Sequence, residues 1–217
     1  MNKSHMAVES DIEVKKAGYK RILDLSVLVG AHVVLAPVFL ILWTGIPTMV
    51  WLQDRGPVFY RQLRAGKNGA PFSLIKFRTM VPDADRCGPV WTTEDDPRIT
   101  RVGKLLRRTG LDELPETINI LKGQMSFVGP RALDVEEQKD LEGQIPGFHD
   151  RLMVRPGLTG LAQVYNATNN SVEKIRLDLE YIQNMSLVLD IKLLLLSVLN
   201  TLAGRWDRRS GKDGGEK

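Results

Sequence analysis

Residues Leu25 to Gln53 read LSVLVGAHVVLAPVFLILWTGIPTMVWLQ and contain no Asp, Glu, Lys or Arg. A stretch of this length exceeds the roughly 20 apolar residues that a helix needs to cross a bilayer. Pro37 interrupts the stretch, because proline lacks a backbone N–H and its ring clashes with the preceding helical turn. The sequence therefore favours either one membrane-spanning helix or a helix that breaks at Pro37 and returns to the side it entered. His32 is interpreted as a packing or interfacial residue.

The charges that flank this apolar stretch do not separate an inner side from an outer side. A spanning helix normally carries an excess of positive charge at its cytoplasmic end. Here basic residues stand at both ends: Lys15, Lys16, Lys20 and Arg21 before the stretch, and Arg55, Arg61 and Arg64 after it. Residues 1–18 are also too few to form a domain on the far side of a membrane. From these residues alone, both topologies stay open.

The composition of the whole chain limits the class of protein. Its 217 residues allow one domain with a hydrophobic core. A mean hydropathy of −0.15 excludes a membrane protein of many spans. A net charge of +4 and a pI of about 9.2 favour anionic partners such as phosphates, nucleic acid or acidic lipid. The single cysteine, Cys87, excludes an intramolecular disulfide and fits a reducing compartment.

A second apolar segment runs from Leu187 to Leu199 and carries Asp190 and Lys192. These charges disfavour a second membrane span. The segment fits either an amphipathic helix in the membrane interface or a helix that covers the core of a soluble domain. The tail at 204–217 is rich in charge and glycine and is predicted to be disordered.

The middle of the chain alternates short apolar runs with turn residues. Residues 57–60 and 72–77 are predicted as strands, and residues 65–69 between them have the composition of a hairpin turn. Leu114, Ile118 and Leu121 recur at helical spacing, and Lys122-Gly123 is typical of a helix end. The spacing predicts a helix that begins close to Asp112-Glu113.

Two interpretations of Asp112-Glu113 follow from this position. In the first, Asp112 caps the helix and Glu113 is an acid favoured by the helix dipole. In the second, an ionised carboxylate at the helix end is a nucleophile that works on phosphate. Two carboxylates facing a diphosphate would need a divalent cation such as Mg²⁺ and basic side chains. Candidate cations are Lys76, Arg78, Arg107, Arg108, Arg131 and Arg155.

Several motifs, in the same order along the chain, resemble the bacterial sugar transferases, and in particular the small monotopic polyprenol-phosphate phosphoglycosyl transferases. The resemblance covers about residues 19–200. Its motifs are YKRILD at 19–24, GPVFYRQ at 56–62, FSLIKFRTM at 72–80, LDELP at 111–115, LKGQMSFVGPR at 121–131 and RPGLTGLAQV at 155–164.

This resemblance implies an α/β fold in which a small catalytic domain sits on a re-entrant, Pro-broken N-terminal membrane helix with amphipathic interfacial helices. It places an interfacial or partly disordered segment at 1–18, the re-entrant helix at 19–53, the catalytic domain at 54–203 and a disordered tail at 204–217. The expected location is the cytoplasmic face of the bacterial inner membrane. Membrane lipids are expected partners and nucleic acid is not, and a homodimer is compatible with the pattern.

The resemblance also implies a reaction. A phosphosugar passes from a nucleoside diphosphate sugar, usually a UDP-sugar, to undecaprenyl (polyprenol) phosphate, which initiates glycoconjugate assembly. It assigns Asp112 as the nucleophile that forms a covalent phosphosugar intermediate with release of UMP. Glu113 is assigned as a second catalytic residue and as the ligand of Mg²⁺. Five further positions match substrate-binding positions of the family: Lys76, Arg78, Arg107, Arg131 and Asp178.

Two departures from the family pattern matter. Ala36 precedes Pro37 where relatives often have Ser, which predicts either another kind of support for the helix break or a weaker bend. Residues 165–167 read Tyr-Asn-Ala where many relatives have Asn-Gly-Arg, so the donor sugar stays unassigned. Two competing hypotheses are a membrane-anchored nucleotide- or lipid-binding module without turnover, and a structural subunit of a glycan-assembly complex. The intact Asp112-Glu113 pair argues against an inactive relative.

Overall fold

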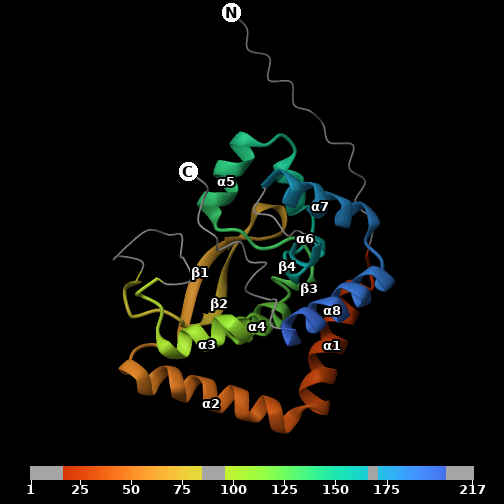
Figure 1. The fold of residues 1–217 in the computed structure, drawn as a ribbon. Helices are drawn as coiled ribbons and strands as arrows, with labels where there is room; N and C mark the ends of the chain where they lie inside the picture. Colours follow the sequence, from red (N-terminus) through yellow and green to blue (C-terminus); the bar gives the residue numbers. More distant parts are fainter. Residues whose placement is uncertain (1–16, 85–95, 166–170, 204–217) are drawn as a thin grey trace, which may run out of the picture.

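The computed structural model describes residues 17–84, 96–165 and 171–203, which form helices around two small sheets (Figure 1). This part of the chain is mixed α/β, as expected. Residues 1–16 of the segment expected at 1–18, and the tail at 204–217, lie outside the described residues. The helices are α1 Lys20–Val34, α2 Ala36–Asp54, α3 Arg101–Thr109, α4 Glu116–Leu121, α5 Val135–Gln144, α6 Leu161–Tyr165, α7 Ser171–Asn184 and α8 Leu187–Leu202. The strands are β1 Phe59–Ala65, β2 Pro71–Phe77, β3 Ser126–Val128 and β4 Gly157–Thr159.

The apolar stretch folds as two helices, α1 and α2, that meet at an elbow (Figure 1). Leu35 leaves the helical conformation, with φ −107° and ψ 28°, so the break lies two residues before Pro37. Proline is tolerated in a first helical turn, where its missing N–H needs no partner, and Pro37 therefore begins α2. The rings of His32 and Phe39 stack across the elbow with centroids 3.9 Å apart, and His32 Nδ1 lies 2.8 Å from the Leu28 carbonyl oxygen. A ring stack thus packs the end of α1 against the first turn of α2 at the break.

Helix α2 is largely exposed and lies along one side of the domain, next to α3 (Figure 1). Among the described residues it is the one helix that is long and apolar enough to cross a membrane, by length and composition. Ile46 and Val50 pack against Phe77 of β2 and Leu106 of α3. Pro47 lies inside α2 without ending it.

The β1–β2 hairpin is antiparallel and pairs Phe59 with Phe77 at one end and Ala65 with Pro71 at the other. The expected turn is confirmed, and Asn68 and Gly69 in it have φ values of 57° and 75°. The prediction of the first strand at 57–60 was wrong in its bounds. It relied on an apolar run, whereas the strand continues through residues 61–65, whose exposed and half-buried side chains alternate.

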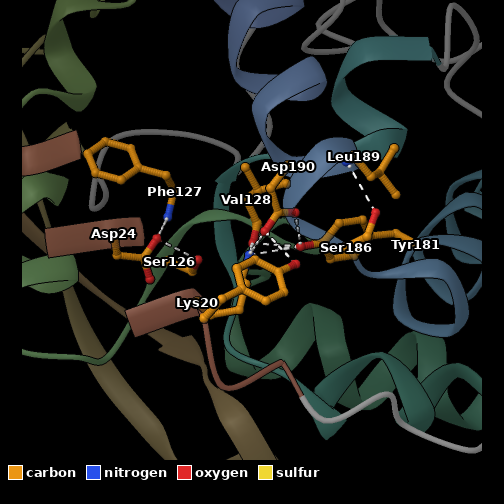
Figure 2. Close-up of polar contacts among 10 residues, drawn as sticks. Lys20, Asp24, Ser126, Phe127, Val128, Tyr181, Ser186, Leu189 and Asp190 are labelled. Carbon is orange, nitrogen blue, oxygen red and sulfur yellow. Dashed lines mark hydrogen bonds and ion pairs between the residues drawn. The ribbon is translucent and has the colours of Figure 1, made fainter. Parts of the chain in front are cut away.

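Two polar side chains on one face of α1 hold β3 (Figure 2). Asp24 is 1% exposed and accepts hydrogen bonds from Ser126 Oγ at 2.9 Å and from the Phe127 N–H at 3.0 Å. Lys20 donates to the Val128 carbonyl at 2.5 Å. Residues four apart share one face of a helix, so this face of α1 holds the backbone of β3 along its length.

The contacts of Asp190 explain why the second apolar segment carries an acidic residue. It is fully buried and accepts hydrogen bonds from Tyr181 Oη at 2.8 Å and Tyr19 Oη at 3.0 Å, and it forms an ion pair with Lys20 at 3.1 Å (Figure 2). Leu193 is also fully buried. The prediction that this helix covers the core is confirmed for one face of α8. The other face exposes the apolar residues that an interfacial helix requires: Val188, Leu195, Val198 and Leu199.

Strands β3 and β4 are parallel and approach closely at glycines. A Cβ atom on Gly157 would lie 2.1 Å from the Gly129 nitrogen, and one on Gly160 would lie 2.2 Å from the Gly129 carbonyl oxygen. No side chain fits at such distances. The glycines hold β4 against the end of β3, and the chain then passes through Pro130 to Arg131.

Candidate active site

Asp112 and Glu113 lie in a short 3₁₀ turn, Leu111–Glu113, between α3 and α4. Gly110, with φ 69°, ends α3 just before this turn. Helix α4 begins only at Glu116, follows Pro115, and has no side-chain cap. The helix-cap interpretation of Asp112 is therefore wrong. The helix-end argument for an ionised carboxylate also loses its basis, because α4 has six residues and a correspondingly small dipole.

Two cations from distant parts of the chain reach Glu113. Lys76 Nζ, on β2, lies 2.6 Å from Glu113 Oε1 and 3.2 Å from Glu116 Oε1. Arg131 Nη2, in the loop after β3, lies 3.6 Å from the same oxygen of Glu113. Glu113 and Glu116 are buried, Asp112 is partly exposed, and the Arg131 side chain is 46% exposed. The cluster therefore combines buried carboxylates with a guanidinium that reaches solvent.

Burial and charge shift the protonation of this cluster. Burial raises the pKa of Glu116 to about 7, with a further increase from the charge of Glu113, although Lys76 opposes the shift. Burial alone would lower the pKa of Lys76, but the carboxylates of Glu113, Glu116 and Asp112 hold this pKa above its usual range. Lys76 therefore stays charged, while burial makes Glu116 a weaker acid than a free glutamate.

A small polar pocket lies beside this cluster, lined in part by Lys76, Glu116, Arg131 and Arg64. Arg64 was not among the expected site residues. The half-buried side chains at 60, 62 and 64 share one face of β1, and this alternation is the signal that could have found it. Burial and the nearby charge of Arg131 lower the pKa of Arg64. Two guanidinium groups and the Lys76 ammonium thus line the pocket together with the Glu116 carboxylate.

The structure gives partners of their own to the other expected substrate-binding residues. Arg107, on α3, donates from Nε to Thr79 Oγ1 at 2.9 Å. Arg78 is buried and makes two hydrogen bonds to the carboxylate of Asp54, at the end of α2. Asp178, on α7, is buried in an ion pair with Arg151. Arg78 and Asp178 are therefore engaged in buried or partly buried ion pairs away from Glu113.

The turn places two carboxylates, those of Asp112 and Glu113, next to each other in the chain. Among the described residues, no group of three or more His, Cys, Asp or Glu is placed to hold a metal ion. Mg²⁺ commonly takes one or two carboxylates from a protein and completes its shell with substrate phosphates and water. Asp112 and Glu113 offer that donor set, with oxygen ligands only.

Comparison with known proteins points to one family. The family model described as "Bacterial sugar transferase" matches residues 15–204. The chain is similar to a UDP-glucose:undecaprenyl-phosphate glucose-1-phosphate transferase of Klebsiella pneumoniae, with 38% identity over 186 residues that make up 83% of this chain and 39% of the relative. It is also similar to the exopolysaccharide production protein PSS of Rhizobium leguminosarum bv. phaseoli, with 37% identity over 193 residues, 84% of this chain and 94% of the relative.

A third relative is the UDP-N-acetylgalactosamine-undecaprenyl-phosphate N-acetylgalactosaminephosphotransferase of Aeromonas hydrophila, with 35% identity over 178 residues, 80% of this chain and 42% of the relative. The chain thus spans less than half the length of two of these relatives and nearly all of the Rhizobium protein. With a family model that matches most of its length, the chain belongs to the bacterial sugar transferase family.

Proposed function

We propose that this protein transfers a sugar 1-phosphate from a UDP-sugar to undecaprenyl phosphate, the initiating step of bacterial glycan assembly. The proposal rests on the turn at Asp112-Glu113, where a partly exposed carboxylate stands beside a buried one that Lys76 and Arg131 reach. Cations placed beside acids suit phosphoryl transfer, because charge develops on the phosphate oxygens. Two of the relatives carry names that specify a UDP-sugar and undecaprenyl phosphate, which supports this substrate class.

Asp112 is the nucleophile of the proposed reaction. One carboxylate oxygen forms a bond to the β-phosphorus of the UDP-sugar, the bond from this phosphorus to the bridging oxygen breaks, and UMP leaves. An oxygen of undecaprenyl phosphate then attacks the same phosphorus and releases Asp112 as a carboxylate. Two smaller steps replace one difficult displacement. The partial exposure of Asp112, against the burial of Glu113, supports this division of roles.

The other charged side chains bind and orient the donor. Glu113 would hold Mg²⁺, and the bound ion would offset the charge of the diphosphate. Lys76 and Arg131 bind phosphate oxygens, and Arg64 adds a third cation at the pocket beside them. These cations lower the repulsion between the diphosphate and the Asp112 carboxylate.

The elbow of α1 and α2 enters the cytoplasmic leaflet of the bacterial inner membrane and returns to the same side in this proposal. Both of its ends are attached to one body, since Lys20 and Asp24 bind β3 and Asp54 pairs with Arg78, the residue that follows β2. Two ends fixed on the same domain support a return to the same side of a hydrocarbon core about 30 Å thick. The exposed apolar faces of the elbow and of α8 support insertion into the interface.

Incubation of the purified protein with a panel of UDP-sugars and Mg²⁺ tests the proposed reaction. Without lipid phosphate, we expect release of UMP and a phosphosugar adduct on Asp112, seen by peptide mass spectrometry. With undecaprenyl phosphate, turnover should follow. Asp112→Asn should abolish the adduct and lower turnover about 1,000-fold or more. Chelation of Mg²⁺ by EDTA should stop both.

Asp140→Asn is the matched control, because Asp140 is an exposed aspartate on α5. It should keep wild-type turnover and adduct formation. Wild-type turnover in Asp112→Asn would contradict the assignment of the nucleophile. Absence of turnover with every UDP-sugar would contradict the proposed donor class.

A further inference from the structure

The backbone that carries Arg131 is held at three consecutive carbonyl groups. The Arg131 carbonyl accepts a hydrogen bond from Arg151 Nη2 at 2.7 Å. The Ala132 carbonyl accepts one from Arg64 Nη1 at 3.3 Å, and the Leu133 carbonyl accepts one from the Ala65 N–H at 2.9 Å. The loop after β3 is therefore fixed at each residue, while the Arg131 side chain extends to Glu113 and to solvent.

The guanidinium of Arg151 is itself held by two further side chains. Its Nε and Nη2 donate to Asp178 Oδ2 at 3.0 and 2.8 Å, and its Nη1 donates to Gln138 Oε1 at 3.0 Å. The side chains of Arg151 and Asp178 are each 4% exposed. A guanidinium is planar and presents its donors in a rigid fork. The position of Asp178 therefore sets the direction from which Arg151 meets the carbonyl of Arg131.

We propose that Arg151 and Asp178 form a positioning pair that fixes the backbone of Arg131, so that the Arg131 guanidinium binds the diphosphate of the nucleotide-sugar donor. The inference rests on the proposed function. It assigns Asp178 a role without substrate contact, because this carboxylate is buried and its charge is met by Arg151. An aspartate placed against a diphosphate would also repel it.

Arg151→Lys and Asp178→Asn test the pair. A lysine keeps the charge but cannot bind Asp178, Gln138 and the Arg131 carbonyl together. We expect each variant to lower kcat/KM for the UDP-sugar by about 10- to 100-fold, as displacement of a phosphate-binding group does. The double variant Arg131→Lys/Arg151→Lys shows whether Arg151 acts through Arg131. If Arg151 acts through Arg131, the second change should lower kcat/KM by no more than about two-fold. Losses that multiply would overturn the inference.

Helix α7 supplies matched controls. Arg176 and Glu173 form an exposed ion pair at 2.7 Å on the same helix as Asp178. Arg176→Lys repeats the arginine-to-lysine change and Glu173→Gln repeats the acid-to-amide change at an exposed ion pair, and both variants should keep wild-type kcat/KM. Thermal unfolding of every variant separates positioning from folding. If Asp178→Asn is unfolded at the assay temperature, the cycle of Arg151→Lys with Arg131→Lys decides.

Binding of inorganic pyrophosphate with Mg²⁺, measured by calorimetry, reports on Arg131 without turnover. Arg151→Lys and Arg131→Lys should each weaken binding, and the double variant should bind no more weakly than Arg131→Lys. This pattern in a protein that turns over no UDP-sugar would refute the proposed reaction and leave the positioning pair in place. Wild-type affinity for pyrophosphate in Arg151→Lys, or no binding by the wild-type protein, would show the inference to be wrong.

Discussion

At Gly157, a single methyl group would lie 2.1 Å from the backbone nitrogen of Gly129. We therefore expect Gly157→Ala to lower the free energy of unfolding by about 1–3 kcal/mol, because the backbone of β3 and β4 must separate. The same change at Gly143, on α5, meets nothing within 4 Å and should stabilise the protein by about 0.5–1 kcal/mol. Denaturant unfolding of both variants gives the comparison. Equal stability of the two would contradict the close approach of the strands.

Single residues also show how far the sequence predicts the site. Lys76, Arg131 and Glu113 were expected at the site, and the structure brings each of the two cations within ion-pair distance of Glu113. Arg151 was missed, because its chemistry is directed at a backbone carbonyl and no motif marks such a contact. Asp178 was expected to bind substrate, and its buried ion pair with Arg151 supports the proposed positioning role instead. Its buried partner could not be inferred, because the two residues are brought together only by the packing of α7.

Among the helices, α2 ends in a contact whose pH dependence can be measured. Hydrogen bonds from Arg78 hold the pKa of Asp54 below its usual range. A carboxylate with a lowered folded pKa stabilises the fold above its unfolded pKa of about 4, and this contribution is lost as pH falls through the folded value. We expect Asp54→Asn to lower the free energy of unfolding at pH 7 by about 1–2 kcal/mol.

Below pH 4 the difference between Asp54→Asn and the wild-type protein should shrink, because the wild-type carboxylate becomes protonated as well. Thermal unfolding between pH 3 and 7 measures this change. Asp140→Asn, on the exposed face of α5, should follow the wild-type curve throughout. A difference that is constant with pH would show that the charge of Asp54 does not contribute.

Elements built from local signals were predicted well, and elements built from distant contacts were not. The turn at Asn68-Gly69 and the helix that carries Asp190 have strong local patterns, and both are present. The parallel pair β3–β4 has three residues in each strand, too few for a periodic pattern. The helix break falls at Leu35, because Pro37 is better accommodated in the first turn of α2 than at a kink.

For the whole molecule, the proposed topology can be tested by cysteine labelling. In a Cys87→Ser background, single cysteines at Gly18 and Arg61 would lie before and after the elbow, at exposed positions. A membrane-impermeant maleimide should label both from the same side of sealed inner-membrane vesicles, since both ends of the elbow are attached to one domain. Labelling from opposite sides would restore the single spanning helix and refute the re-entrant topology.

The elbow formed by α1 and α2 is attached to the domain at both of its ends. The first attachment consists of the hydrogen bonds from α1 to β3 that Lys20 and Asp24 make. The second is the ion pair of Asp54 with Arg78. A helix turns by about 100° per residue. One residue added between Asp24 and Leu35 would therefore rotate the tip of the elbow about the axis of α1. The number of residues between the two attachments therefore determines how far the tip of the elbow extends from the domain and in which direction it points. In the proposed topology, the number of residues between the two attachments sets how deep the elbow enters the membrane. The lipid does not set this depth.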